Sequence, residues 1–126
     1  DEAHSSGVLG KHLLGIFEHY GITVGPHHIK MGTLGKAYGS YGAYILASEA
    51  IISFLENRAK PVIYSTAPSV FDTALALVNV QKIARHSRRY RRRIEKRQVL
   101  IRSLLGIDLP ALILALQYSG NEEVLR

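Results

Sequence analysis

A single lysine stands among closely spaced glycines in the stretch Gly32-Thr33-Leu34-Gly35-Lys36-Ala37-Tyr38-Gly39-Ser40. Glycines allow the backbone to turn tightly and to come close to a ligand. A lysine amine held in such a turn can attack a carbonyl carbon and form a Schiff base, and Thr33 can bind an anion such as a phosphate. The stretch is not a nucleotide-binding phosphate loop, because Lys30 and Ala37 stand where that loop needs Gly and Ser or Thr. Taken alone, the motif also suits a solvated lysine in a glycine turn.

The composition of the chain limits the classes of protein to which it can belong. Its 126 residues amount to one domain or less, and 47% of them are hydrophobic, as in ordinary globular proteins. The chain has no cysteine, which excludes disulfides and thiolate metal sites, and no metal is expected. It has neither an 18-residue apolar run nor a signal peptide, so we expect a cytoplasmic protein. The chain begins with Asp1 and ends in what reads as the start of a helix, which predicts a piece of a longer protein.

The net charge of +6 is concentrated in one segment. Nine of the 16 basic residues lie there: Arg85, Arg88, Arg89, Arg91, Arg92, Arg93, Lys96, Arg97 and Arg102. Such a block can mark a nucleic-acid or membrane-surface patch, but Tyr90 is the only aromatic residue among the arginines, so base stacking has poor support. We interpret the run as a solvated helix face, with no specific nucleic-acid partner and no membrane partner.

Short apolar runs alternate with helical patterns along the chain. We expect a loop at 1–10, a weak helical turn at 13–20, and strands at 28–31, 42–47 and 61–65. Another apolar run, at 109–116, suits a strand, although Pro110 demotes it to an edge. Two helices are expected, one at 48–59 and one from Pro68 to near Gly106. Strands that alternate with helices indicate an α/β layered fold.

Both expected helices carry apolar residues on one side. Buried positions of the first are expected at Ile51, Ile52, Phe54 and Leu55. In the long helix apolar residues recur every three or four positions, so one face should pack while the arginines line the other. That face consists of Phe71, Leu75, Val78, Ile83, Tyr90, Ile94, Leu100 and Leu104.

Three segments, in this order, resemble one enzyme family. They are Asp1-Glu2-Ala3-His4-Ser5-Ser6-Gly7-Val8-Leu9-Gly10, the glycine stretch around Lys36, and Tyr64-Ser65-Thr66-Ala67. Together they resemble the α-oxoamine synthases, pyridoxal 5'-phosphate enzymes of the aspartate-aminotransferase fold type (fold type I). The resemblance implies an α/β fold that is part of the large domain, truncated at both ends and covering the middle third of a family member. Residues 1–84 would be the central part of the cofactor-binding large domain, 85–106 the basic end of the long linking helix, and 107–126 the start of the C-terminal small domain.

The resemblance also implies a role for six residues of this chain. Asp1 matches the aspartate that pairs with the pyridine nitrogen of the cofactor, and His4 the histidine near its phenolic oxygen. Lys36 matches the lysine that carries the cofactor as a Schiff base and then removes the α-proton of the substrate. Thr33 matches a phosphate ligand, while Ser65 and Thr66 match a pair that reaches the cofactor phosphate of the neighbouring subunit. Without the family resemblance, Asp1 is a terminal carboxylate in solvent and His4 is a surface or packing histidine. Ser65 and Thr66 are then a hydroxyl pair that caps the following helix.

The implied reaction is the condensation of an amino acid with an acyl-CoA, releasing CoA and carbon dioxide, by a homodimer. The arginines of the basic run would then serve solubility and contacts with CoA or the other subunit. Asp-Glu-Ala-His and Tyr-Ser-Thr favour the biotin-pathway branch, with the glycine C-acetyltransferase branch close behind. The aminolevulinate branch usually has valine where Ala3 stands. The chain departs from the family in having Gly42-Ala43 for Gly-Gly, and it contains neither the ring-stacking aromatic segment nor the arginine that binds the substrate carboxylate. We therefore expect the 126 residues alone to be inactive, either as a segment of a synthase or as an inactive remnant.

Two further classes of function stay open on the sequence. Asp-Glu-Ala-His is also a magnesium-binding motif of ATP-dependent helicases, but such an enzyme should have Ser-Ala-Thr downstream and this chain has Ser65-Thr66-Ala67. The second class is a basic module that binds RNA through the arginine-rich helix.

Overall fold

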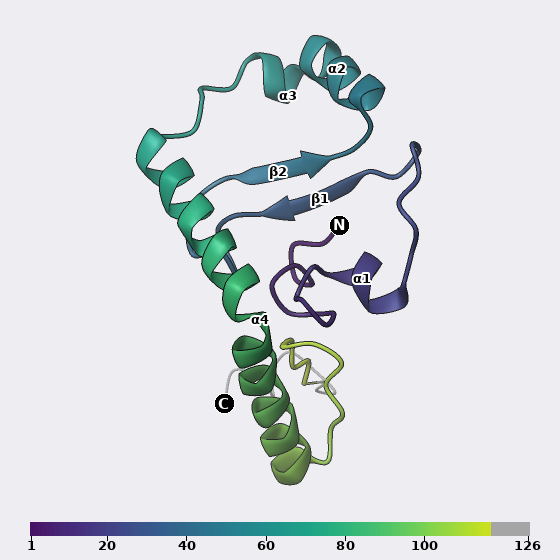
Figure 1. Ribbon diagram of the computed structural model, residues 1–126, viewed down its shortest axis with the longest axis vertical. Coiled ribbons are helices and arrows are strands. Elements are labelled where there is room, and N and C mark those ends of the chain that lie inside the picture. Colours follow the sequence, from purple (N-terminus) through teal and green to yellow (C-terminus); the bar gives the residue numbers. More distant parts are fainter. Residues whose placement is uncertain (117–126) are drawn as a thin grey trace, which may run out of the picture.

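The computed structural model describes residues 1–116 (Figure 1). A two-stranded sheet lies between a pair of short helices and an irregular N-terminal loop, and one long helix runs past all of them on one side (Figure 1). The expected helix start at 120–126 lies outside the described residues. Within residues 1–116 we find no helix that is both long and apolar enough to cross a membrane.

The sheet is an antiparallel pair of β1 (Lys30–Thr33) and β2 (Ala43–Leu46). Gly32 lies opposite Tyr44 in the register. The connecting segment is the glycine stretch, which is closed by a hydrogen bond from Leu34 N–H to the Gly42 carbonyl at 2.8 Å. Both strands were predicted, although β1 begins two residues later than expected. The sheet therefore holds the two ends of the lysine-bearing turn together.

The short helices follow local signals in the sequence. Helix α1 (Ile16–Tyr20) ends at Gly21, whose φ of 63° is a left-handed conformation that suits glycine. Helix α2 (Glu49–Arg58) begins after Ser48, as predicted. The expected buried face of α2 is wrong at Phe54, which is 64% exposed, because no other described segment covers that side.

Residues 61–65 were predicted to form a strand, and this prediction is wrong. The structure has the short helix α3 (Lys60–Ile63) with Pro61 in its first turn. Proline suits that position because its fixed φ is helical and its missing N–H would have no partner there. The N–H groups of Val62 and Ile63 bond to the Ala59 carbonyl instead of to a neighbouring strand.

The long helix α4 (Val70–Leu105) has 36 residues and was predicted with nearly these limits. It begins at Ser69, whose hydroxyl accepts a hydrogen bond from Asp72 N–H, and it ends at Gly106 with φ 67°. His86 has non-helical dihedral angles (φ −117°, ψ 20°) and kinks the helix near its middle. The kink adjoins the predicted limit between 84 and 85, but the predicted division into domains remains untested.

Half of the predicted apolar face of α4 packs against other residues. Ile94 is 8% exposed, and Leu75, Ile83 and Tyr90 are half-buried. The prediction is wrong for the other half, because nothing in residues 1–116 covers those side chains. Its exposed members are Phe71, Val78, Leu100 and Leu104.

The predicted strand at 109–116 is also wrong, since these residues have no regular secondary structure. Their backbone is bound by a side chain of α4: the Gln98 amide donates to the carbonyls of Leu109 at 2.9 Å and Ala111 at 3.4 Å. Pro110 between them has no N–H to give to a strand partner. This contact folds the segment back along the basic half of α4 (Figure 1).

Candidate active site

The N-terminal loop is built around a buried carboxylate. Glu2 is 3% exposed, and its Oε2 accepts hydrogen bonds from Ser5 Oγ at 2.5 Å and Ile16 N–H at 2.8 Å. Its Oε1 lies 3.3 Å from Lys30 Nζ. Burial raises the pKa of Glu2, but the hydrogen bonds from Ser5 and Ile16 and the charge of Lys30 outweigh it and leave that pKa below its usual value. Glu2 is therefore a charged anchor that joins the loop to α1 and β1.

The backbone of the same loop lies against β1, which fixes the position of His4. Glu2 N–H donates to the Met31 carbonyl at 2.7 Å. On the other side the loop touches the lysine turn so closely that a Cβ on Gly7 would come within 2.4 Å of the Ala37 Cβ. Gly7 also has a φ of 81°, which side chains disfavour. Only glycine lets the two segments approach in this way.

A second polar contact joins the loop to β2. Tyr44 Oη donates to Ser6 Oγ at 3.1 Å, and Ser6 is 4% exposed. The Tyr44 ring lies over Gly32, where a Cβ would be 2.3 Å from it. Tyr38 lies beside Tyr44, and burial, together with the neighbouring Tyr44, raises the pKa of Tyr38 to about 12. Tyr38 therefore remains a neutral hydroxyl at physiological pH.

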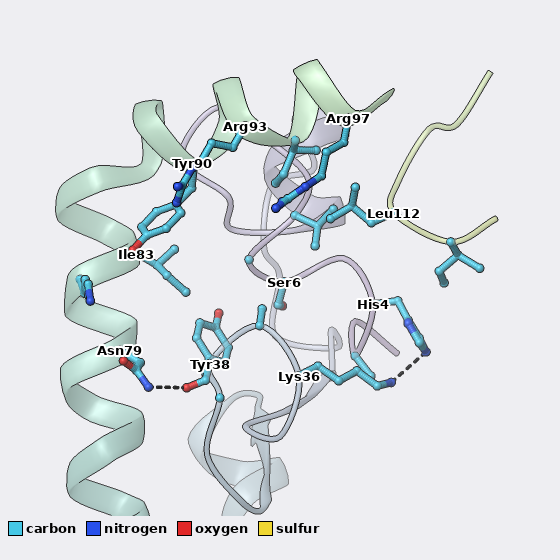
Figure 2. A pocket seen from close by; sticks show the side chains of 18 residues that line it. His4, Ser6, Lys36, Tyr38, Asn79, Ile83, Tyr90, Arg93, Arg97 and Leu112 are labelled. Carbon is cyan, nitrogen blue, oxygen red and sulfur yellow. Dashed lines mark hydrogen bonds between the residues drawn. The ribbon is translucent and has the colours of Figure 1, made fainter. Parts of the chain in front are cut away.

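These anchors bring Lys36 and His4 together. Lys36 Nζ lies 2.8 Å from His4 Nε2, within hydrogen-bond distance, although 32 positions separate them in the chain (Figure 2). Both side chains line a cavity of about 510 Å³. Small-molecule sites are typically clefts of about 300–1,000 Å³. The pair can therefore meet a ligand of that size, with the amine as nucleophile or base and the imidazole as its hydrogen-bond partner.

The lysine turn is fixed to α4 by two hydrogen bonds. Asn79 Nδ2 donates to the Tyr38 carbonyl at 2.7 Å (Figure 2), and Ser40 Oγ donates to the Asp72 carbonyl at 2.7 Å. Helix α4 thus supplies the wall of the cavity that faces the turn.

Asp1 and Thr33 are near the site in sequence but do not line its cavity. Asp1 is exposed, and its Oδ1 accepts a hydrogen bond from Ala3 N–H at 2.7 Å. The Thr33 hydroxyl donates to the Gly42 carbonyl and accepts from Gly35 N–H, both at 3.1 Å. In this structure Thr33 stabilises the turn that carries Lys36, and its predicted contact with a phosphate remains untested.

Ser65 and Thr66 lie apart from the other candidate residues. Both are exposed in the segment between α3 and α4, and Ser65 Oγ donates to the Val62 carbonyl at 3.0 Å. Neither residue lines the cavity. Their predicted role requires a neighbouring subunit and stays a prediction.

Several residues of the site were missed by the sequence analysis. Glu2 was considered only as a letter of the Asp-Glu-Ala-His motif, and its pairing with Lys30 has no local signal because 28 positions separate them. Tyr38 belongs to the glycine stretch and could have been included. Among the polar cavity residues of α4, Tyr90 was predicted to pack and Arg93 and Arg97 to lie on a solvated face, whereas Asn79 and Lys82 were not considered.

The chain resembles known proteins over nearly its whole length. Residues 1–115 match the family described as aminotransferase class I and II. An 8-amino-7-oxononanoate synthase of Helicobacter pylori (strain J99) is 40% identical over 125 residues, which are 99% of this chain and 34% of that protein. A putative 8-amino-7-oxononanoate synthase of Nostoc punctiforme is 44% identical over 112 residues, which are 86% of this chain and 28% of that protein. The chain thus spans about a third of the length of these relatives.

Solved structures show the same relation in three dimensions. The crystal structure of 8-amino-7-oxononanoate synthase from Francisella tularensis aligns with a TM-score of 0.74 and 32% identity over 90% of this chain and 34% of that one. Serine palmitoyltransferase from S. paucimobilis, with a bound PLP–myriocin aldimine, aligns with a TM-score of 0.81 over 98% of this chain and 33% of that one, but at 20% identity it bears on the fold alone. The expected fold is thereby confirmed as a part of the fold type I large domain. The chain belongs to the aminotransferase class I and II family, and within it to the α-oxoamine synthases.

Proposed function

We propose that this chain supplies the lysine-bearing part of a pyridoxal-phosphate-dependent enzyme that condenses an amino acid with an acyl-CoA and releases CoA and carbon dioxide. The observation that carries the proposal is the 2.8 Å contact between Lys36 Nζ and His4 Nε2 at the wall of a ligand-sized cavity. The names of the relatives, together with Ala3 and Tyr64-Ser65-Thr66, favour an 8-amino-7-oxononanoate synthase over the glycine C-acetyltransferase alternative. The proposal includes a cytoplasmic homodimer.

The residues around the cavity fit pyridoxal phosphate by their chemistry. An aldehyde requires an amine, which Lys36 presents, and a phenolic oxygen requires a hydrogen-bonding partner, which the imidazole of His4 can be. Among residues 1–116, none that lines the cavity carries a carboxylate that would repel an anionic cofactor. The cofactor, when bound, supplies an electron-withdrawing ring that stabilises negative charge on the substrate's α-carbon.

The chain's own residues bind, orient and move a proton. His4 Nε2 lies 2.8 Å from the Lys36 amine and so gives it a hydrogen-bond partner beside the cavity. Lys36 is then placed to hold the aldehyde carbon of the cofactor, and in its free amine form to remove the α-proton of an amino acid. Glu2 positions His4 through the loop, and Thr33 positions Lys36 through the turn. Asp1 is exposed and directly precedes the buried Glu2, so its proposed contact with the pyridine nitrogen needs the Asp1 side chain to turn toward the cavity.

Borohydride reduction tests the assignment of Lys36. The chain is mixed with substoichiometric pyridoxal phosphate, reduced and mapped by peptide mass spectrometry, and we expect the pyridoxyl group on Lys36. Lys36→Arg should abolish this label, whereas Lys60→Arg, an exposed lysine outside the cavity, should leave it unchanged. His4→Gln should slow the labelling, because the amine loses its partner. A label distributed over the other lysines with no preference for Lys36 would overturn the proposal.

A further inference from the structure

One wall of the Lys36 cavity is cationic and is supplied by α4. Lys82, Arg93 and Arg97 line the cavity from this helix, and Figure 2 shows Arg93 and Arg97 on the side away from Lys36 and His4. Of the 18 residues that line the cavity, four carry a formal positive charge and none a negative one. We call Lys82, Arg93 and Arg97 the cationic wall.

Helical geometry places Arg93 and Arg97 on one face. They are four positions apart and thus one turn from each other. Lys82 lies on the other side of the kink at His86 and lines the same cavity. Between them the half-buried Tyr90 lies toward the same cavity (Figure 2). The cations therefore lie along the cavity, with an aromatic ring among them.

The carboxylates nearest in sequence are engaged with other arginines. Glu95 Oε1 lies 3.2 Å from Arg91 Nε, and Asp108 Oδ1 lies 3.3 Å from Arg102 Nε. Among the residues that the structure describes, no carboxylate lies within salt-bridge distance of the cationic wall. A cavity with several cations and no anion attracts a ligand of opposite charge.

We infer that the cationic wall binds the phosphate groups of a ligand whose reacting carbon lies at Lys36. Three cations exceed the single charge of one carboxylate and match a phosphate dianion or a diphosphate. Arginine pairs bind phosphate oxygens through two parallel N–H groups, which gives orientation as well as attraction. The identity of the ligand rests on the proposed function, which offers two sources of phosphate: the cofactor and the diphosphate of CoA. The cationic wall itself does not depend on that function.

Inorganic pyrophosphate is the first probe. Its binding is measured by calorimetry in phosphate-free buffer at about 0.15 M salt, where attraction between distant exposed charges is screened. The double variant Arg93→Gln, Arg97→Gln should bind pyrophosphate about tenfold more weakly, because two charge-assisted contacts are lost at exposed positions. The matched control is Arg88→Gln, Arg92→Gln, which removes the same charge at the same spacing from exposed residues outside the cavity.

The control should retain the wild-type affinity within about twofold. Glutamine has a helix propensity similar to that of arginine, and circular dichroism checks that α4 is intact in both double variants. An equal loss in the two variants would reduce the inference to nonspecific charge attraction. Failure of the wild-type chain to bind pyrophosphate would overturn it.

Two pairs of ligands then distinguish the sources of phosphate. In a Lys36→Ala background, which allows only noncovalent binding, pyridoxal phosphate is compared with pyridoxal, and CoA with pantetheine. If the cofactor is the source, loss of Arg93 and Arg97 weakens the binding of pyridoxal phosphate but not that of pyridoxal. If CoA is the source, the same loss weakens the binding of CoA but not that of pantetheine. If the substitutions affect both members of each pair equally, the assignment to the phosphate of either ligand is wrong.

Failure of this inference and failure of the proposed function give different results. If Lys36 is not labelled by the cofactor while pyrophosphate binding still depends on Arg93 and Arg97, the proposed function fails and the cationic wall stands. If Lys36 is labelled and the two double variants bind pyrophosphate equally, the function stands and the cationic wall is wrong.

Discussion

Replacing Glu2 by glutamine tests whether one buried carboxylate holds the candidate site together. The carboxylate accepts hydrogen bonds from Ser5 Oγ at 2.5 Å and Ile16 N–H at 2.8 Å, and Lys30 Nζ lies 3.3 Å away. Glutamine has the same shape but only one acceptor oxygen. If that oxygen faces Ser5 and Ile16, the NH₂ group faces the Lys30 ammonium, and two donors then oppose each other.

The expected cost follows from these contacts. A hydrogen bond to a charged group contributes about 1.5–3 kcal/mol. Lys30 keeps a second partner, since its Nζ also donates to the Leu14 carbonyl at 2.6 Å, which limits the loss. We expect Glu2→Gln to lower the free energy of unfolding by about 2–3 kcal/mol at pH 7.

The effect should depend on pH in one direction. The folded-state pKa of Glu2 lies below its usual value of 4.5, so the unfolded chain takes up a proton first as the solution is acidified. The stabilisation is therefore complete above about pH 4.5 and declines as the pH falls through the folded-state pKa. The difference between wild type and Glu2→Gln should shrink over the same interval.

Urea unfolding at pH 7 and at pH 3 measures both quantities, with amide hydrogen exchange at Ile16 as the local probe. The matched control is Glu95→Gln, which also removes one carboxylate but from an exposed pair with Arg91. Such pairs contribute about 0–1 kcal/mol. A loss for Glu2→Gln no larger than that of the control, or one that is the same at both pH values, would show that Glu2 is not the anchor described here.

Three further predictions concern the turn, the helix and the basic run. Gly32→Ala should destabilise the chain by about 1–3 kcal/mol, because its Cβ would lie 2.3 Å from the Tyr44 ring, whereas Gly35→Ala, with 3.5 Å to the nearest atom, should be tolerated in the same thermal melt. Ser69→Ala should lower the stability of α4 by about 1 kcal/mol through loss of its N-terminal cap. Ser103→Ala should not, because the Ser103 hydroxyl bonds only within the helix. Circular dichroism during urea unfolding compares the two variants. The basic half of α4 should bind nucleic acid weakly and with strong salt dependence, and a preference for one RNA or DNA sequence at nanomolar affinity and physiological salt would contradict this.

Local patterns in the sequence were sufficient where neighbouring residues supply the physical cause. Ser69 and Gly106 define the limits of α4 because a cap acts within one helical turn. The glycine stretch predicted a tight turn around Lys36, and the two strands that hold it were expected on either side. The resemblance of three segments to the α-oxoamine synthases predicted the family and the fold, both of which the comparisons confirm.

The sequence alone misjudged segments whose conformation depends on what lies beside them. Residues 61–65 and 109–116 have the apolar composition of strands, but a strand needs a partner for its N–H and C=O groups. In the described chain, Pro61 begins a helical turn and the carbonyls of Leu109 and Ala111 bind the Gln98 side chain. Phe54 has the spacing of a buried helix residue, but it is exposed because no described segment packs against that side of α2.

The sequence by itself determined which chemical groups the site contains: an amine in a glycine turn, an imidazole and a carboxylate in the N-terminal segment, and a basic helix. Only the tertiary structure decided which of them meet. It brings Lys36 to 2.8 Å from His4, buries Glu2 beside Lys30 and leaves Asp1, Ser65 and Thr66 exposed. It also brings the cationic wall and Lys36 to the same cavity. The reason is physical: these distances depend on contacts between segments far apart in the chain, which no local propensity specifies.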